Sequence, residues 1–83
     1  MMSEFVELTA GEFKAVVVPF RFMPVQTILP ILSEPDSMQQ FAKTIELLRD
    51  QVAVDVRSSF DLLPMDQMIL LVSAWVASGV VNG

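Results

Sequence analysis

The stretch PMDQMILLVSAWVASG, residues 64–79, decides most of what the sequence predicts about the fold. Pro64 suits the first position of a helix, Asp66 places an anion in its first turn, and Gly79 suits a C-terminal stop. Apolar side chains cover nearly its whole circumference: Met68, Leu71, Val72, Trp75 and Val76 form one stripe, and Ile69, Leu70 and Ala77 lie beside it. A helix of this kind is buried on more than one side. In so short a chain, we expect the additional side to meet a second protein.

The same region carries no charge from Gln67 to Gly83, so a membrane-spanning helix has to be considered. A spanning helix needs about 20 apolar residues. This run is shorter, is interrupted by Gln67, Ser73 and Ser78, and lacks a basic flank. The chain also begins Met-Met-Ser-Glu-Phe, without the cationic region of a signal peptide. We therefore expect a cytoplasmic protein with no membrane partner.

Upstream, residues 4–20 predict a β-hairpin, because two short runs rich in Val and Phe are separated by Ala10 and Gly11. Gly11 supplies the positive φ that a turn needs. Ala10 is unfavourable in a two-residue turn of the mirror-image types I′ and II′. We therefore expect a longer loop with a bulge rather than a two-residue turn. Alternation divides the second strand into two faces, with Phe13, Ala15 and Val17 on one and Glu12, Lys14, Val16 and Val18 on the other. Glu4 and Glu7 are expected on the exposed face with Glu12.

The middle of the chain, residues 23–60, reads as helical. Pro24 suits a first helical turn, and Pro30 is expected to end that helix near residues 27–29. Ser37 and Gln40 form a capping-box pattern at the start of the next helix. One face of that helix then carries Met38, Phe41, Ile45 and Leu48. The alternation in residues 51–60 fits a strand as well as a helix, and we favour a helix from its context.

Composition limits the fold and the chemistry. The chain has 83 residues, of which 53% are apolar and 18% charged, so it forms one domain. A domain of this size buries only about 60% of its unfolded surface, so the apolar excess predicts a partner or self-association. We predict an α+β fold, mostly α, with a hairpin (4–20) packed on three or four short helices, comprising a helical middle (23–60) and a C-terminal helix (64–79).

Enzymatic activity is not expected. The chain has no Cys and no His, which removes disulfides, the usual zinc sites and Ser/His or Cys/His nucleophiles. Asp61 and Asp66 resemble a carboxylate pair, but no nucleophile or glycine-rich loop accompanies them, and Asp66 reads better as part of a helix start. Glu34 and Asp36 lack EF-hand spacing. We therefore predict no cofactor and no metal. The net charge of −5, with five scattered cations, also argues against nucleic acid.

The ordered segments resemble a known family. Its pattern appears in Val18-Pro19-Phe20, Met23-Pro24 and Glu34-Pro35-Asp36, and then in Pro64-Met65-Asp66-Gln67, Leu71-Val72, Ala74-Trp75 and Gly79. Together these segments are similar to the tail assembly chaperones of long-tailed, siphovirus-type bacteriophages. The resemblance covers about residues 13–79. Its most distinctive part is the C-terminal stretch, residues 64–79.

The resemblance implies a small, acidic, non-enzymatic protein that acts in the host cytoplasm and is not retained in the mature virion. Such proteins hold the long tape-measure protein in solution while tail-tube subunits polymerise around it. The implied partners are therefore the tape-measure protein and the tail-tube protein, together with further copies of the chain as a homo-oligomer. In many such phages a frameshift near the end of the reading frame adds a second domain, and this chain resembles the short, unshifted product.

A holding function needs an apolar, adaptable surface, and flexible Met side chains supply adaptability, with Met23, Met38, Met65 and Met68 as the candidates. The candidate partner-binding residues are Phe20, Phe22, Met23, Met65, Met68, Leu71, Val72 and Trp75. Apolar stripes at helical spacing are more often core than interface, so both interpretations of these residues stay open. The alternative function is a small structural or regulatory interaction subunit, such as a virion neck component or an antitoxin-like inhibitor. A third interpretation is a holin-type membrane-associated protein.

Overall fold

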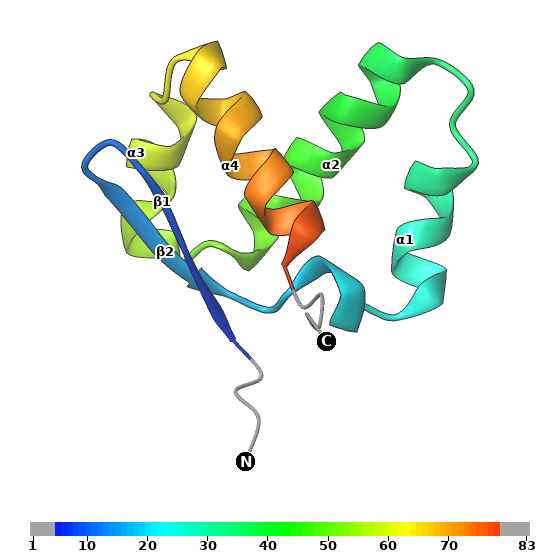
Figure 1. Cartoon of the computed structure of the whole chain (residues 1–83), viewed down its shortest axis with the longest axis horizontal. Helices are drawn as coiled ribbons and strands as arrows, with labels where there is room; N and C mark the ends of the chain where they lie inside the picture. The colour runs from blue at the N-terminus through cyan, green and yellow to red at the C-terminus, as the bar shows by residue number, and fades with distance from the viewer. Residues whose placement is uncertain (1–4, 79–83) are drawn as a thin grey trace.

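An N-terminal β-hairpin is followed by four α-helices in the computed structural model, which describes residues 5–78 (Figure 1). The elements are β1 (Val6–Ala10), β2 (Phe13–Val17), η1 (Phe20–Phe22), α1 (Val25–Leu32), α2 (Ser37–Gln51), η2 (Val54–Val56), α3 (Arg57–Asp61) and α4 (Met65–Ala77). Here η marks a single turn of 3₁₀ helix. The fold is α+β and mostly α-helical, as the sequence predicts. The expected helix stop at Gly79 lies outside the described residues.

The hairpin turn is tighter than expected. β1 and β2 pair antiparallel with Ala10 opposite Phe13, which leaves Gly11 and Glu12 as a two-residue turn. The prediction of a longer, bulged loop is wrong because Ala10 belongs to the strand and not to the turn. Gly11 takes the first central position with φ of 60°, the arrangement of a type II′ turn. The small Ala10 side chain is free to lie in the core, where it is buried.

The alternation of residues along the strands gives the hairpin one buried and one exposed face, as predicted. Its inner face holds Leu8, Ala10, Phe13, Ala15 and Val17, all of them buried. Its outer face exposes Glu7, Thr9, Lys14 and Val16, and Glu12 is exposed in the turn. Glu4 lies outside the described residues. Because an isolated hairpin is marginal in water, the buried face depends on the helices that pack against it, and α4 contacts β1 directly.

Helix α1 continues past Pro30, so the expected ending near residues 27–29 is wrong. Proline removes the hydrogen bond that its own N–H would give to the carbonyl four residues earlier. Here that carbonyl belongs to Gln26, which is exposed, so the carbonyl that loses its helical partner is on a solvent-accessible residue. Pro24 stands just before the helix as its N-cap residue, and its carbonyl accepts the N–H of Thr27 at 2.9 Å.

Asp36, and not Ser37, caps α2. Its backbone is extended, and its Oδ1 accepts the N–H groups of Met38 at 2.9 Å and Gln39 at 3.2 Å. Ser37 is already the first helical residue. The capping-box prediction therefore fails by one position, because the carboxylate that precedes Ser37 caps the helix and makes Met38 and Gln39 the donors. Gln40 does not reach back to the cap, since its Nε2 donates to the carbonyl of Ile31 at 3.0 Å.

Residues 54–61 form two helical segments, η2 and α3, rather than a strand. A strand would place Val52 and Val54 on the same face, but their exposures are 2% and 78%. The backbone turns helically from Val54 onward. One Arg57 guanidinium nitrogen donates to the Val52 carbonyl at 3.0 Å, which ties α3 to the end of α2.

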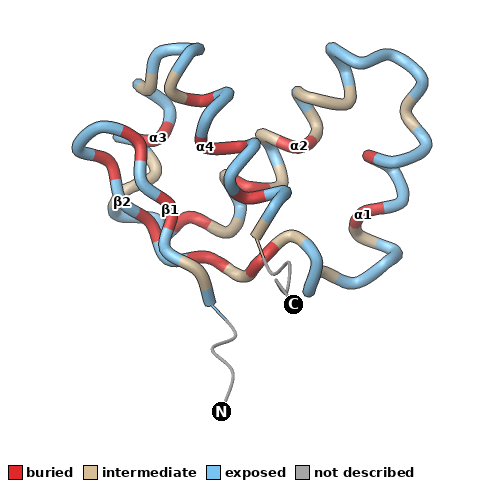
Figure 2. The backbone as a smooth tube through the Cα atoms, viewed as in Figure 1, coloured by how far each residue is buried: buried red, intermediate tan, exposed pale blue. Residues whose placement is uncertain are grey.

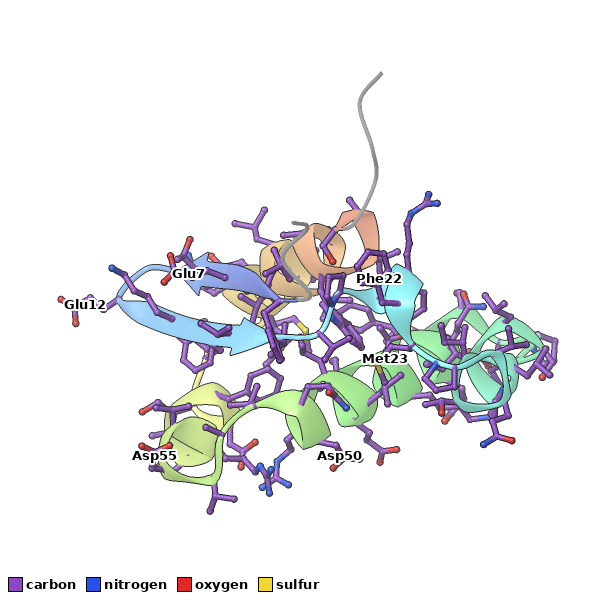
Figure 3. The ribbon with its side chains drawn as sticks, turned by 90° about the horizontal axis from the view of Figure 1, so that it is seen from below. Glu7, Glu12, Phe22, Met23, Asp50 and Asp55 are labelled. Atoms are coloured by element: carbon purple, nitrogen blue, oxygen red, sulfur yellow. The ribbon has the colours of Figure 1, made fainter. Side chains whose placement is uncertain are left out.

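The core lies between two layers, with the hairpin and α4 on one side and α2 and α3 on the other (Figure 3). Trp75 is fully buried; its Nε1 donates to the Val18 carbonyl at 2.7 Å, and its ring meets Phe20 edge-on at 5.0 Å. Phe60 from α3 packs against Phe13 of β2 with ring centres 5.9 Å apart. Figure 2 shows buried residues interspersed with exposed ones along the hairpin and α4, whereas residues 37–43 at the start of α2 include no buried residue.

Candidate protein-binding groove

Exposed apolar side chains from α2 and α4 meet in a shallow hollow. Met38 on α2 is 74% exposed, and Met65 and Ile69 on α4 are 61% and 47% exposed. With Phe41 and Ser73 they line a volume of about 460 Å³, which we call the α2–α4 hollow. The spacing of four residues from Met65 to Ile69 and from Ile69 to Ser73 places all three on one side of α4. That side lies next to the stripe that fills the core.

A second hollow adjoins the first. It lies between α1, α2 and α4, has a volume of about 310 Å³, and is called here the α1–α4 hollow. Its apolar walls include Ile31 and Leu32 from α1, Phe41 from α2, and Val72 and Val76 from α4. Phe41 lines both hollows, so the two together form one surface, which we name the groove. The ribbon shows no described element covering the first half of α2 between α1 and α4 (Figure 1).

The groove offers apolar contact and little else. Among the residues that the structure describes, no charged side chain lines either hollow, and the polar side chains there are Ser37, Gln40, Thr44 and Ser73. Two of these already have partners, since Gln40 donates to the Ile31 carbonyl and Thr44 donates to the Gln40 carbonyl at 2.8 Å. A partner therefore gains affinity here by burying apolar surface rather than by forming ordered polar bonds.

Two ion pairs hold the helices that form the groove. Arg49 on α2 binds Asp61 on α3 through two hydrogen bonds, of 2.7 and 2.8 Å. Lys43 on α2 binds Glu34, beyond the end of α1, at 2.7 Å. The Gln40 contact with the Ile31 carbonyl adds a second tie between α1 and α2. These contacts link α2 to α1 at one end and to α3 at the other.

The ion pairs shift the pKa values of Asp61, Arg49 and Glu34. Hydrogen bonds from Arg49 lower the pKa of Asp61, and the same bonds raise the pKa of Arg49. The hydrogen bond from Lys43 lowers the pKa of Glu34, and the backbone N–H of Asp36 adds to that effect. All these groups stay charged near neutral pH, which keeps the helix contacts in place.

The structure separates the eight sequence candidates into three groups. Met68, Leu71 and Trp75 are buried in the core and present no surface to a partner, while Val72 is buried but lines the α1–α4 hollow. Met65 is exposed in the α2–α4 hollow. The third group belongs to the connector around η1: Phe20 is half-buried against Trp75 and lines the α1–α4 hollow, Met23 is half-buried, and Phe22 is 45% exposed (Figure 3).

Met38 was expected as an adaptable Met, but several other groove residues were not among the candidates: Leu32, Phe41, Ile69 and Val76. The periodicity of α4 contains a usable signal for some of them. Met65, Ile69 and Val76 fall within one narrow arc of a helical projection, beside the core stripe of Met68, Leu71 and Trp75. No signal in the sequence shows that α1 and α2 leave this arc uncovered, because that depends on how the helices are arranged.

Asp61 and Asp66, the two carboxylates that the sequence suggests as a pair, have separate partners in the structure. Asp61 is held by Arg49, and Asp66 accepts the N–H of its neighbour Gln67 at 2.9 Å. Within residues 5–78, no three His, Cys, Asp or Glu side chains lie close enough together to hold a metal ion. In the same range, no helix has both the length and the apolar character needed to cross a bilayer.

A further hollow lies at the tip of the hairpin, between the β-turn, α3 and the start of α4. Its volume is about 520 Å³, and its lining includes Glu12, Ser59 and Gln67. It is more polar than the groove and has no matched set of donors and acceptors. We therefore assign the binding role to the groove. Comparison of the chain with family models, curated proteins and solved structures gave no match.

Proposed function

We propose that the chain is a phage tail assembly chaperone that binds apolar helical segments of the tape-measure protein in the groove. In this role it keeps the tape-measure protein soluble in the host cytoplasm until tail-tube subunits assemble around it. Binding is non-covalent and involves no cofactor. The observation that carries the proposal is the groove itself, which gathers Met38, Phe41, Met65 and Ile69 on one open surface.

A helix is the form of client that such a surface accommodates best. The groove walls are helices, whose backbone N–H and C=O groups are already paired within each helix except at the ends. An extended peptide would therefore bury its own backbone groups without partners, and each unpaired group costs about 1–3 kcal/mol. A helix satisfies its backbone internally and presents only side chains. Tape-measure proteins, as the family resemblance implies, are long and helical.

The properties of the groove also suit a chaperone rather than a permanent subunit. The exposed Met38 and Met65 side chains repack around differently shaped apolar partners. The net charge of −5 keeps the protein and its complexes in solution although apolar surface is exposed. The expected homo-oligomer would use the edge of the hairpin, which leaves the groove open to a client.

Co-expression with the tape-measure protein tests the proposal. We expect the wild-type chain to keep the tape-measure protein in the soluble fraction, and the double variant Met65→Asp/Ile69→Asp to lose this effect while remaining folded. Val54→Asp is the matched control, because Val54 is 78% exposed and lies outside the groove. The proposal fails if the groove variant, shown to be folded by circular dichroism, solubilises the client as well as the wild type does.

Mass spectrometry of purified virions distinguishes the chaperone from the structural alternative. A chaperone is absent from finished particles or present far below one copy per tail. Stoichiometric recovery in purified virions would instead assign the chain to the virion, as a neck or tail component.

A further inference from the structure

The groove has an acidic end and a basic end. Helices α2 and α4 both begin at the same edge of the molecule, the upper edge in Figure 1. The exposed carboxylates Asp36 and Asp66 stand at these two helix starts, close in sequence to Met38 and Met65 of the groove. At the opposite edge, exposed Arg21 adjoins Phe20, which lines the α1–α4 hollow. Lining residues between the two ends are uncharged.

The carboxylates at the acidic end take part in no ion pair among residues 5–78. The two ion pairs of residues 5–78 use Lys43 with Glu34 and Arg49 with Asp61. Neither includes Asp36 or Asp66. The partial positive charge at a helix N-terminus offsets each carboxylate in part, so the expected effect on a partner is moderate and depends on salt.

We infer that the helix bound in the groove is amphipathic and carries Lys or Arg at the end that lies beside Asp36 and Asp66. This inference rests on the proposed function and specifies the client segment. The groove side of α4 runs from Met65 to Val76, which at 1.5 Å per residue is about 16 Å, or three helical turns. A segment of about three turns, with an apolar stripe and a cationic end, matches both the lining and the charges.

Synthetic peptides of about 16 residues test the inference. Three labelled peptides share one stripe of Leu on an Ala-rich helix and carry Lys, Gln or Glu at one end. Fluorescence anisotropy is measured at low and at physiological salt. We expect the Lys peptide to bind about three- to tenfold more tightly than the Glu peptide at low salt. We expect added salt to reduce the difference.

The variant Asp36→Asn/Asp66→Asn removes the acidic end without removing the cap, since Asn caps a helix as well as Asp does. It should abolish the preference for Lys. The matched control is Asp50→Asn/Asp55→Asn, which removes the same charge from the side of α2 and η2 that faces away from α4 (Figure 3). If both double variants reduce the preference equally, net charge and not the groove sets it, and the inference is overturned.

Ile69→Asp separates the inference from the proposed function. If the three peptides bind equally and Ile69→Asp abolishes binding of all of them, the charge preference is refuted and the groove remains a helix-binding site. If no peptide binds and Ile69→Asp converts an oligomer into a monomer by light scattering, the occupant is a second copy of the chain. That result overturns both statements.

Discussion

At the scale of single residues, Trp75 links α4 to the segment that follows the hairpin. Its indole N–H donates to the Val18 carbonyl, its ring packs on Phe20, and it has no exposed surface. Trp75→Phe removes the donor, leaves the Val18 carbonyl unpaired and creates a small cavity. We expect the free energy of unfolding to fall by about 2–4 kcal/mol.

Urea unfolding followed by circular dichroism measures this loss, because the substitution removes the only Trp of the chain and with it the fluorescence signal. Val54→Ala is a suitable control, since an exposed substitution changes stability by less than about 0.5 kcal/mol. A Trp75→Phe variant as stable as this control would show that Trp75 does not anchor the core.

The ion pairs predict how stability depends on pH. Because the pKa values of Asp61 and Glu34 are lowered in the folded state, their contribution is fully present above their unfolded pKa of about 4. The contribution is lost as the pH falls through the lowered folded values. Asp61→Asn should therefore lower the thermal midpoint at pH 7 but not at about pH 2, where the wild type has lost the pair as well.

Thermal melts of the wild type and Asp61→Asn at both pH values provide the comparison. High salt should shrink the difference at pH 7, because both members of the pair are well exposed. A constant difference between pH 7 and pH 2 would mean that the substitution acts through packing and not through charge.

At the scale of elements, the cap of α2 distinguishes the structure from the sequence pattern. Asp36 accepts two backbone N–H groups, whereas Ser37 is the first residue of the helix. Asp36→Ala should cost about 1 kcal/mol, Asp36→Asn much less, and Ser37→Ala close to nothing. Chemical denaturation of the three variants measures the order. A larger loss for Ser37→Ala than for Asp36→Ala would restore the capping box that the sequence suggested.

Most helices and strands could be predicted from the sequence pattern. Alternation in the second strand, the apolar circumference of residues 64–79 and the face of residues 38–48 all predict elements that the structure contains. Local signals failed where two neighbours competed for one role. Ala10 or Glu12 could join Gly11 in the turn, and Ala10 is instead buried in the core. Asp36 or Ser37 could cap the helix, and Asp36 accepts the two N–H groups.

Pro30 illustrates a different limit. Its effect on a helix depends on whether the carbonyl that it leaves unpaired can reach water. That carbonyl belongs to Gln26, whose exposure follows from how α1 packs on α2. The groove likewise depends on how the helices pack. The sequence marks α4 as apolar on too many sides, but only the arrangement of α1, α2 and α4 shows which side stays uncovered.

At the scale of the whole molecule, α4 serves both stability and binding, and single substitutions separate the two roles. Leu71 is 1% exposed in the core, and Ile69, two residues earlier, is 47% exposed in the groove. Leu71→Ala should lower the free energy of unfolding by about 2–5 kcal/mol. Ile69→Ala should change it by less than about 1 kcal/mol and weaken client binding.

Equilibrium unfolding and a binding assay on the same two variants test this division. Equal losses of stability at the two positions would mean that Ile69 is covered in solution, by a second copy or by a rearranged α1. The division of roles would then be refuted for the free protein.

The central claim is that a client helix lies in the groove, and Met methyl groups report on it directly. Met38 and Met65 line the groove, whereas Met68 is buried in the core. Carbon-13 labelling of the Met methyls, followed by NMR titration with the tape-measure protein, should shift the Met38 and Met65 signals while that of Met68 changes little. Client binding with unchanged Met38 and Met65 signals would contradict the claim.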